Sequence, residues 1–124
     1  MKLIIITADF PNIFGGVSDY SFHISTTLAK LGNEVIVITS NNKDVIRSSN
    51  YNIEVMPIIN NWGYQDVKNI NNIIKDYKPD FVSLQYVPYM YSPSGLPFSL
   101  AYLAFILWLK NILLITTFHE VARK

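Results

Sequence analysis

A glycine loop near the start of the chain, Phe14-Gly15-Gly16-Val17-Ser18, holds the residues best suited to bind an anion. It follows the apolar run 3–6, and after it apolar residues recur every three or four positions, as in a helix. The first N–H groups of a helix have no partner within it, and with the helix dipole they attract phosphate. Gly16 has no Cβ, so the backbone there can approach a ligand or take a positive φ angle. Gly15 and Gly16 are therefore candidate phosphate-binding residues, although two glycines can also serve only to pack a helix on a sheet.

Other polar residues with chemical potential stand at the ends of predicted strands. Asp9 follows the first strand, Gln85 and Tyr86 end the fourth, and His119 and Glu120 follow the fifth. Ligands of open α/β sheets bind at the carboxyl ends of the strands, so we expect these residues to lie near the glycine loop. For a histidine at a strand end, a structural hydrogen bond is the alternative role.

The segment 87–97 is a loop of unusual composition, in which Tyr89 and Tyr91 stand among prolines and a glycine. Such a loop suits a semi-rigid surface that stacks on a sugar ring or touches lipid. The alternative is that its tyrosines cover the edge of the core.

Hydrophobic patterns predict the elements that position these residues. Continuous apolar or β-branched runs, which suit strands covered on both faces, predict strands at 3–6, 35–39, 53–56, 81–86 and 112–117. Helical spacing predicts helices over 17–31 and over 66–77, the second with Asp66 as N-cap. We expect Pro57 to end the third strand, and Gly32 to follow the first helix in the left-handed conformation.

Two helical segments carry distinctive apolar patterns. In the first predicted helix, one face is formed by the row Tyr20, Ile24, Leu28 and Leu31. The segment 98–109 is apolar on every side but shorter than the roughly 20 residues that cross a bilayer, which predicts a buried helix. With right-handed crossovers, these elements predict a Rossmann-like open parallel α/β sheet of order 3-2-1-4-5 with helices on both faces.

Composition excludes several classes of function. The chain has 124 residues, with 10 Lys and Arg against 9 Asp and Glu, and the net charge of +1 gives no footprint for nucleic acid. The absence of cysteine excludes disulfides and zinc–thiolate sites, so a cytoplasmic location is the default. The first apolar run stops at Thr7, too soon for a signal peptide.

Other nucleotide-binding α/β classes match poorly. The second strand ends in 40–42, Ser-Asn-Asn, without the carboxylate of a dinucleotide-binding domain, and the first loop lacks the full G-x-G-x-x-G. The 16–18 segment, Gly-Val-Ser, lacks the lysine of a P-loop. A phosphoacceptor domain needs an aspartate at the end of the third strand, where Met56-Pro57 stands. Flavin binding stays open.

Three stretches together carry a family resemblance: GGVSDYSFHISTTLAKLGNEVIVIT, PDFVSLQY and, after the apolar helix, ILLITTFHE. In this order and spacing they resemble the amino-terminal domain of the retaining glycosyltransferases of family 4, which have the GT-B fold. The similarity extends from Lys2 to Glu120. It implies a glycosyltransferase of the hexosyltransferase type, which moves a sugar from a nucleotide-sugar donor to an acceptor hydroxyl with retention, without a metal or other cofactor.

In that family the amino-terminal domain mainly holds the acceptor, and a carboxyl-terminal domain binds the donor nucleotide. By resemblance, Gly15 and Gly16 take the role of the loop that reaches the donor diphosphate and sugar, and His119 matches the catalytic-site histidine beside the reacting sugar. The acceptor-side candidates are then Asp9, Gln85, Tyr86, Tyr89 and Glu120.

The resemblance also implies partners. We expect 1–124 to be an incomplete amino-terminal domain, inactive alone, that needs a donor-binding domain in the same or a second chain. The expected acceptor is a glycan or a lipid-linked molecule of polysaccharide or glycolipid synthesis, with peripheral contact to the inner face of the membrane. The alternative is a stand-alone, non-catalytic Rossmann-like module that binds a nucleotide or a protein.

Overall fold

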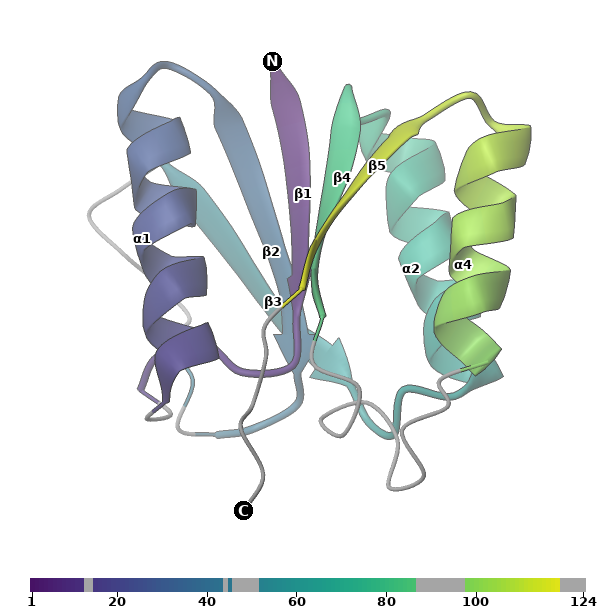
Figure 1. Cartoon of the computed structure of the whole chain (residues 1–124), viewed down its shortest axis with the longest axis horizontal. Helices are drawn as coiled ribbons and strands as arrows, with labels where there is room; N and C mark the ends of the chain where they lie inside the picture. The colour runs from purple at the N-terminus through teal and green to yellow at the C-terminus, as the bar shows by residue number, and fades with distance from the viewer. Residues whose placement is uncertain (13–14, 44, 46–51, 87–97, 119–124) are drawn as a thin grey trace.

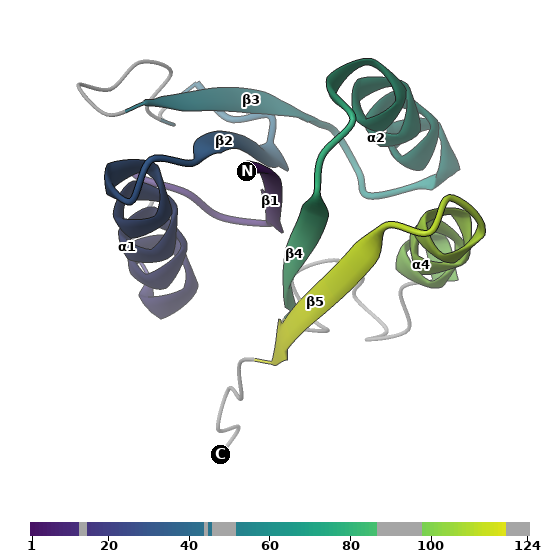
Figure 2. The same ribbon diagram turned by 90° about the horizontal axis from the view of Figure 1, so that it is seen from above.

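The computed structural model describes residues 1–12, 15–43, 45, 52–86 and 98–118, which form one five-stranded sheet with helices on both faces (Figure 1). In chain order the elements are β1 (Lys2–Thr7), α1 (Gly16–Lys30), β2 (Glu34–Ser40), β3 (Ile53–Ile59), α2 (Tyr64–Tyr77), β4 (Phe81–Tyr86), α4 (Phe98–Leu109) and β5 (Leu113–Phe118). All four strand pairs are parallel and the order is β3-β2-β1-β4-β5, which confirms the predicted Rossmann-like topology. Helix α1 covers one face, and α2 and α4 cover the other (Figure 2).

The central strand β1 is buried on both faces, as its continuous apolar sequence predicts. Ile4 and Ile6 pack on the side of α2 and α4, whereas Leu3 and Ile5 pack on the side of α1. Each of these side chains is at most 1% exposed, and burying each one contributes about 2 kcal/mol. A slip of one residue would exchange the two faces, so the pattern fixes the register of the sheet.

Helix α1 meets the sheet through small polar residues. Ser18, Ser21 and Ser25 are fully buried, whereas Tyr20 and Leu31, the two ends of the apolar row, are exposed. Small side chains let the helix approach the sheet closely, and the Ser25 hydroxyl is satisfied locally because it donates to the Ser21 carbonyl at 2.6 Å. The helix is confirmed, and its contact with the sheet is formed by the buried serines together with Ile24 and Leu28, the middle of the apolar row.

Two predicted boundaries have different outcomes. Gly32, just past α1, has φ +96°, which confirms the left-handed turn. Pro57 does not end β3, which continues to Ile59. The prediction is wrong because β3 is an edge strand, where a residue without an N–H donor can face the open side, and because the register shifts close by, between Thr39 and Ser40.

The start of α2 also differs from the prediction. Gly63 is the N-cap, and Asp66 lies inside the first turn of α2. Its buried carboxylate accepts hydrogen bonds from three backbone N–H groups of the preceding loop, those of Asn60, Asn61 and Trp62, at 2.8 to 3.3 Å. The N-cap prediction was wrong because the carboxylate binds the loop before the helix rather than the helix itself.

Helix α4 is confirmed, but the prediction that it is buried is wrong for its outer side. Leu103 and Leu107 are buried in the core shared with α2, whereas Phe105, Trp108 and Leu109 are more than half exposed. A sequence that is apolar all round cannot show which side meets the sheet. Among the described residues, no helix is long and apolar enough to cross a membrane.

Asp66 gives the first testable prediction. We expect Asp66→Ala to lower the free energy of unfolding by about 2–3 kcal/mol, because it leaves buried N–H groups without an acceptor. Asp76→Ala is the matched control, since Asp76 is an exposed carboxylate on the same helix and its loss should change the free energy by less than about 0.5 kcal/mol. Urea unfolding of both variants measures this, and equal losses would contradict the role given to Asp66.

Candidate functional site

The carboxyl edge of the sheet brings several of the candidate residues together. Strands β1 and β4 end side by side, with Thr7 paired to Gln85, and β5 ends beside β4, with Thr117 paired to Gln85. Helix α1 begins at the same edge, which is the lower edge in Figure 1. Parallel topology thus places Asp9, Gly15 and Gly16 at the same edge of the sheet as the ends of β4 and β5.

The glycine loop ends in a helix start without a side-chain cap. Gly15 is the N-cap and has no side chain with which to cap the helix, and its carbonyl accepts the Asp19 N–H at 3.0 Å. The positive φ angle lies at Gly15, at +148°, and not at Gly16. A Cβ at Gly16 would meet no atom within 4 Å. Gly16 is therefore not required by the packing of the described chain, whereas Gly15 is required by backbone conformation.

Ser18 is a polar residue that the sequence did not single out. It lies in the first turn of α1 and is fully buried, yet its hydroxyl has no hydrogen-bond partner among the described residues. One other buried side-chain atom, Asn71 Oδ1 on α2, shares this condition. A serine three positions after a helix cap was the available signal, but serine is common there and carries no ligand signature on its own.

Hydroxyl groups hold the backbone where the chain leaves β1. The Ser21 hydroxyl donates to Thr7 Oγ1 at 3.0 Å, and the Thr7 hydroxyl donates to the Asp9 carbonyl at 3.0 Å. From β2, the Thr39 hydroxyl donates to the Ala8 carbonyl at 3.2 Å. Residues of α1, β1 and β2 therefore fix the position from which Asp9 projects.

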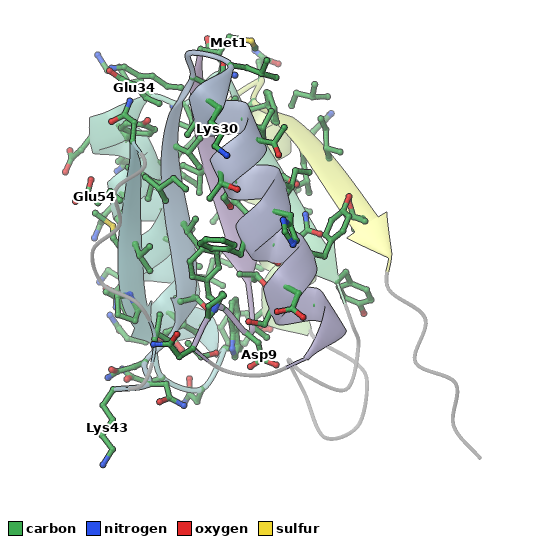
Figure 3. All side chains as sticks on the ribbon, turned by 90° about the vertical axis from the view of Figure 1, so that its left-hand side faces the viewer. Met1, Asp9, Lys30, Glu34, Lys43 and Glu54 are labelled. Atoms are coloured by element: carbon green, nitrogen blue, oxygen red, sulfur yellow. The ribbon has the colours of Figure 1, made fainter. Side chains whose placement is uncertain are left out.

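Asp9 carries a half-buried carboxylate at the carboxyl edge of the sheet. Among the described residues, no group donates a hydrogen bond to its side chain, and burial raises the pKa of its carboxyl above the ordinary value. Figure 3 shows Asp9 at the same end of the molecule as the start of α1. The next residue, Phe10, is buried and packs on Phe22 of α1 with ring centroids 5.9 Å apart, which anchors the loop. The site thus holds a fixed hydrogen-bond acceptor beside a helix N-terminus.

Gln85 and Tyr86 face opposite sides of the sheet. Gln85 is fully buried, and its Nε2 donates to Ser83 Oγ at 3.0 Å. Tyr86 is partly buried and packs against the core on the side of α2 and α4. Because Gln85 pairs with Thr7, which bonds to α1, it shares a face with the glycine loop, whereas Tyr86 does not.

Three candidates, Tyr89, His119 and Glu120, lie outside the described residues. The strand before the last two is described, and its end stands beside Gln85 at the carboxyl edge. Within the described ranges, no three side chains of the kinds that bind metals gather in one place. One hollow of the described surface lies at the opposite, amino edge, where its lining mixes lysines and carboxylates: Met1, Lys2, Gly32, Glu34, Lys78 and Asp80.

A family model matches most of the chain. A model of the family described as Glycosyltransferase Family 4 matches residues 14–124, which include the glycine loop and the end of β5. No curated protein matches the chain.

The raised pKa of Asp9 predicts how the stability of the chain depends on pH. A carboxyl whose pKa is raised by folding is destabilising when charged, so stability falls as the pH rises through its titration range. We expect Asp9→Asn to raise the free energy of unfolding at neutral pH. This gain should disappear when the pH falls below both the folded and the unfolded pKa, because Asp9 is then neutral in both states.

The matched control is Asp19→Asn, since Asp19 is an exposed carboxylate in the first turn of α1. Its charge favours the helix N-terminus, so its loss should cost about 0.3–1 kcal/mol. Urea unfolding at neutral and acidic pH measures both variants. A loss of stability in Asp9→Asn at neutral pH would show that the carboxylate has a stabilising partner.

Proposed function

The chain belongs to glycosyltransferase family 4, and from this we propose that it is the acceptor-side half of a retaining glycosyltransferase that uses a nucleotide-sugar donor. The observation that carries the proposal is the uncapped N-terminus of α1 at the carboxyl edge of the sheet. Gly16 leaves the space in front of these N–H groups open. The Ser18 hydroxyl, buried in the same turn, has no partner among the residues that the structure describes. A donor phosphate supplies the acceptor oxygens that these N–H groups lack.

The chemistry assigned to this edge is the stabilisation of a leaving phosphate. In transfer with retention, negative charge develops on the diphosphate while the sugar becomes positive, so N–H groups aimed at the phosphate stabilise the transition state. His119 has the role of positioning the sugar through hydrogen bonds to its hydroxyls. It is not assigned as a base, since the leaving phosphate itself can take the proton of the acceptor.

The proposal assigns acceptor binding to the surface around Asp9. A half-buried carboxylate that receives no hydrogen bond from the described residues suits one from a sugar hydroxyl, which replaces the water lost on burial. Gln85, Tyr86, Tyr89 and Glu120 are the further acceptor-side residues of the proposal. The side chain of Gln85 is fully buried in the sheet, so its proposed role is to support the acceptor side from beneath the surface.

The nucleotide of the donor is assigned to a second α/β domain, in the same or another chain. The proposed reaction takes place at the cytoplasmic side, on a glycan or lipid-linked acceptor. The enzyme assembled with its donor domain should transfer sugar from a panel of nucleotide sugars, and nuclear magnetic resonance of the product should show the anomeric configuration of the donor. An inverted product would contradict the proposal, and so would micromolar nucleotide-sugar binding by the isolated chain in calorimetry, which is the result expected of a stand-alone nucleotide-binding module.

Substitution of Gly16 tests whether the glycine loop binds phosphate or only packs the helix on the sheet. We expect Gly16→Ala to leave stability unchanged or slightly higher, because its Cβ meets nothing and alanine favours a helix. Donor use should nevertheless fall at least tenfold in kcat/KM, because the Cβ stands where a phosphate approaches the backbone. Gly15→Ala is the control: its φ of +148° strains any side chain, so it should lose stability by about 1–2 kcal/mol. Unchanged donor kinetics in a folded Gly16→Ala enzyme would leave the loop with a packing role only.

His119 is tested by its effect on turnover. His119→Ala in the assembled enzyme should lower kcat about a hundredfold, the size expected for a lost positioning contact, with little change in melting temperature. His119→Gln retains a hydrogen-bonding group and should recover part of the loss. Near-normal turnover in His119→Ala, or a loss that unfolding fully explains, would return the residue to a structural role.

A further inference from the structure

The outer side of the α2 and α4 layer carries a row of exposed, mostly aromatic side chains, here called the aromatic stripe, formed by Tyr64, Tyr102, Phe105, Trp108 and Leu109. These side chains are between 48% and 71% exposed. On α4 they recur at spacings of three and four residues, so they lie on one side of the helix. The rings contact one another, with Phe105 and Trp108 stacked at 6.1 Å and Tyr64 and Tyr102 edge to face at 5.8 Å. The stripe therefore runs along α4 and crosses to the start of α2.

Lysines accompany the aromatic stripe. Lys68 and Lys75 follow Tyr64 by four and eleven residues, so all three leave α2 on the same side, and the contact of Tyr64 with Tyr102 shows that this side is next to α4. Lys110 directly follows α4. All three lysines are exposed, and none forms an ion pair within the described chain.

Negative charge is sparse on this side. Helix α4 contains no acidic residue. On α2, Asp66 is buried and occupied by backbone N–H groups, and Asp76 leaves the helix about a third of a turn away from Tyr64. The aromatic stripe thus lies in a positively charged surround, which is complementary to an anionic surface.

We propose that this surface docks on an anionic lipid bilayer, with α4 lying along the membrane rather than across it. Tyrosine and tryptophan favour the boundary between headgroups and acyl chains, and lysines near it are attracted to anionic lipids. A docked protein fits less well, because lysine is depleted in protein interfaces. Both helices run from the carboxyl edge of the sheet to its amino edge, so docking lays this whole helix layer along the headgroups (Figure 1).

Sedimentation with vesicles tests the proposal on the full chain. The protein should bind equimolar phosphatidylcholine and phosphatidylglycerol vesicles and bind pure phosphatidylcholine vesicles weakly. The double variant Phe105→Ser, Trp108→Ser should bind at least tenfold more weakly, since two apolar side chains are lost from the contact. The double variant Lys68→Gln, Lys75→Gln should lose about fivefold for each lysine.

Matched controls come from the other side of the molecule. Leu31→Ser removes an exposed apolar side chain after α1, and Lys30→Gln removes the exposed lysine in the last turn of α1, the helix on the opposite face of the sheet (Figure 3). Neither should change vesicle binding. Because every altered residue is exposed, all variants should keep the melting temperature of the original chain.

Trp108 also provides a direct signal. It is 71% exposed, whereas the other tryptophan, Trp62, is 8% exposed, so a blue shift on vesicle binding and quenching by brominated lipid report Trp108. Trp108→Phe should remove this signal and keep vesicle binding. The proposal is overturned if the original chain does not bind anionic vesicles, if the controls weaken binding as much as the stripe variants, or if sedimentation equilibrium shows that the stripe instead joins two copies of the chain. Transfer to a water-soluble acceptor is a separate measurement, so failure of docking leaves the proposed activity standing.

Discussion

The arrangement of the carboxyl edge depends on the hydrogen bonds of the Thr7 hydroxyl. It accepts from Ser21 and donates to the Asp9 carbonyl, and so joins β1, α1 and the loop between them. At the end of a strand buried on both faces, a carbonyl without a partner would cost about 1–3 kcal/mol. Ser21 reaches Thr7 only because α1 lies close to the sheet, which the small side chains of Ser18 and Ser25 allow. These two hydrogen bonds therefore set both the position of the helix and the direction in which Asp9 projects.

The sheet could be predicted because its signals are local. Runs such as 35–39 suit only strands covered on both faces, and the alternation with helices leaves few right-handed topologies. Topology in turn placed Asp9 and the glycine loop at one edge, because parallel strands share that edge. The glycine loop could be located without knowing which glycine carries the positive φ angle. That detail depends on how α1 is held at Gly15, which periodicity does not record.

The predictions failed where a residue's role is set by a partner elsewhere in the chain. Asp66 was assigned to its own helix but binds the loop before it, and Pro57 was judged without knowing that β3 is an edge strand. Helix α4 was expected to be buried because every side is apolar, yet a helix in the outermost layer has only one side to bury. The burial of Ser18 could not be predicted either, since serine gives no apolar signal for the inner side of a helix.

The buried polar groups and the exposed apolar side chains of this structure differ in whether the chain itself supplies a partner for them. The buried charge of Asp66 is compensated by three N–H groups of this chain, so its role is structural. Asp9 and the Ser18 hydroxyl have no compensating partner among the described residues. No other described element packs over the aromatic stripe, whose side chains are exposed. Asn71 Oδ1 also has no partner, and nothing in the described chain explains it. Natural sequences accept such costs mainly at functional sites, where a ligand or surface supplies the missing contact. A phosphate and a sugar hydroxyl meet the needs of the carboxyl edge, and a lipid surface meets those of the outer helix layer, so the two sites are chemically distinct and can be tested separately.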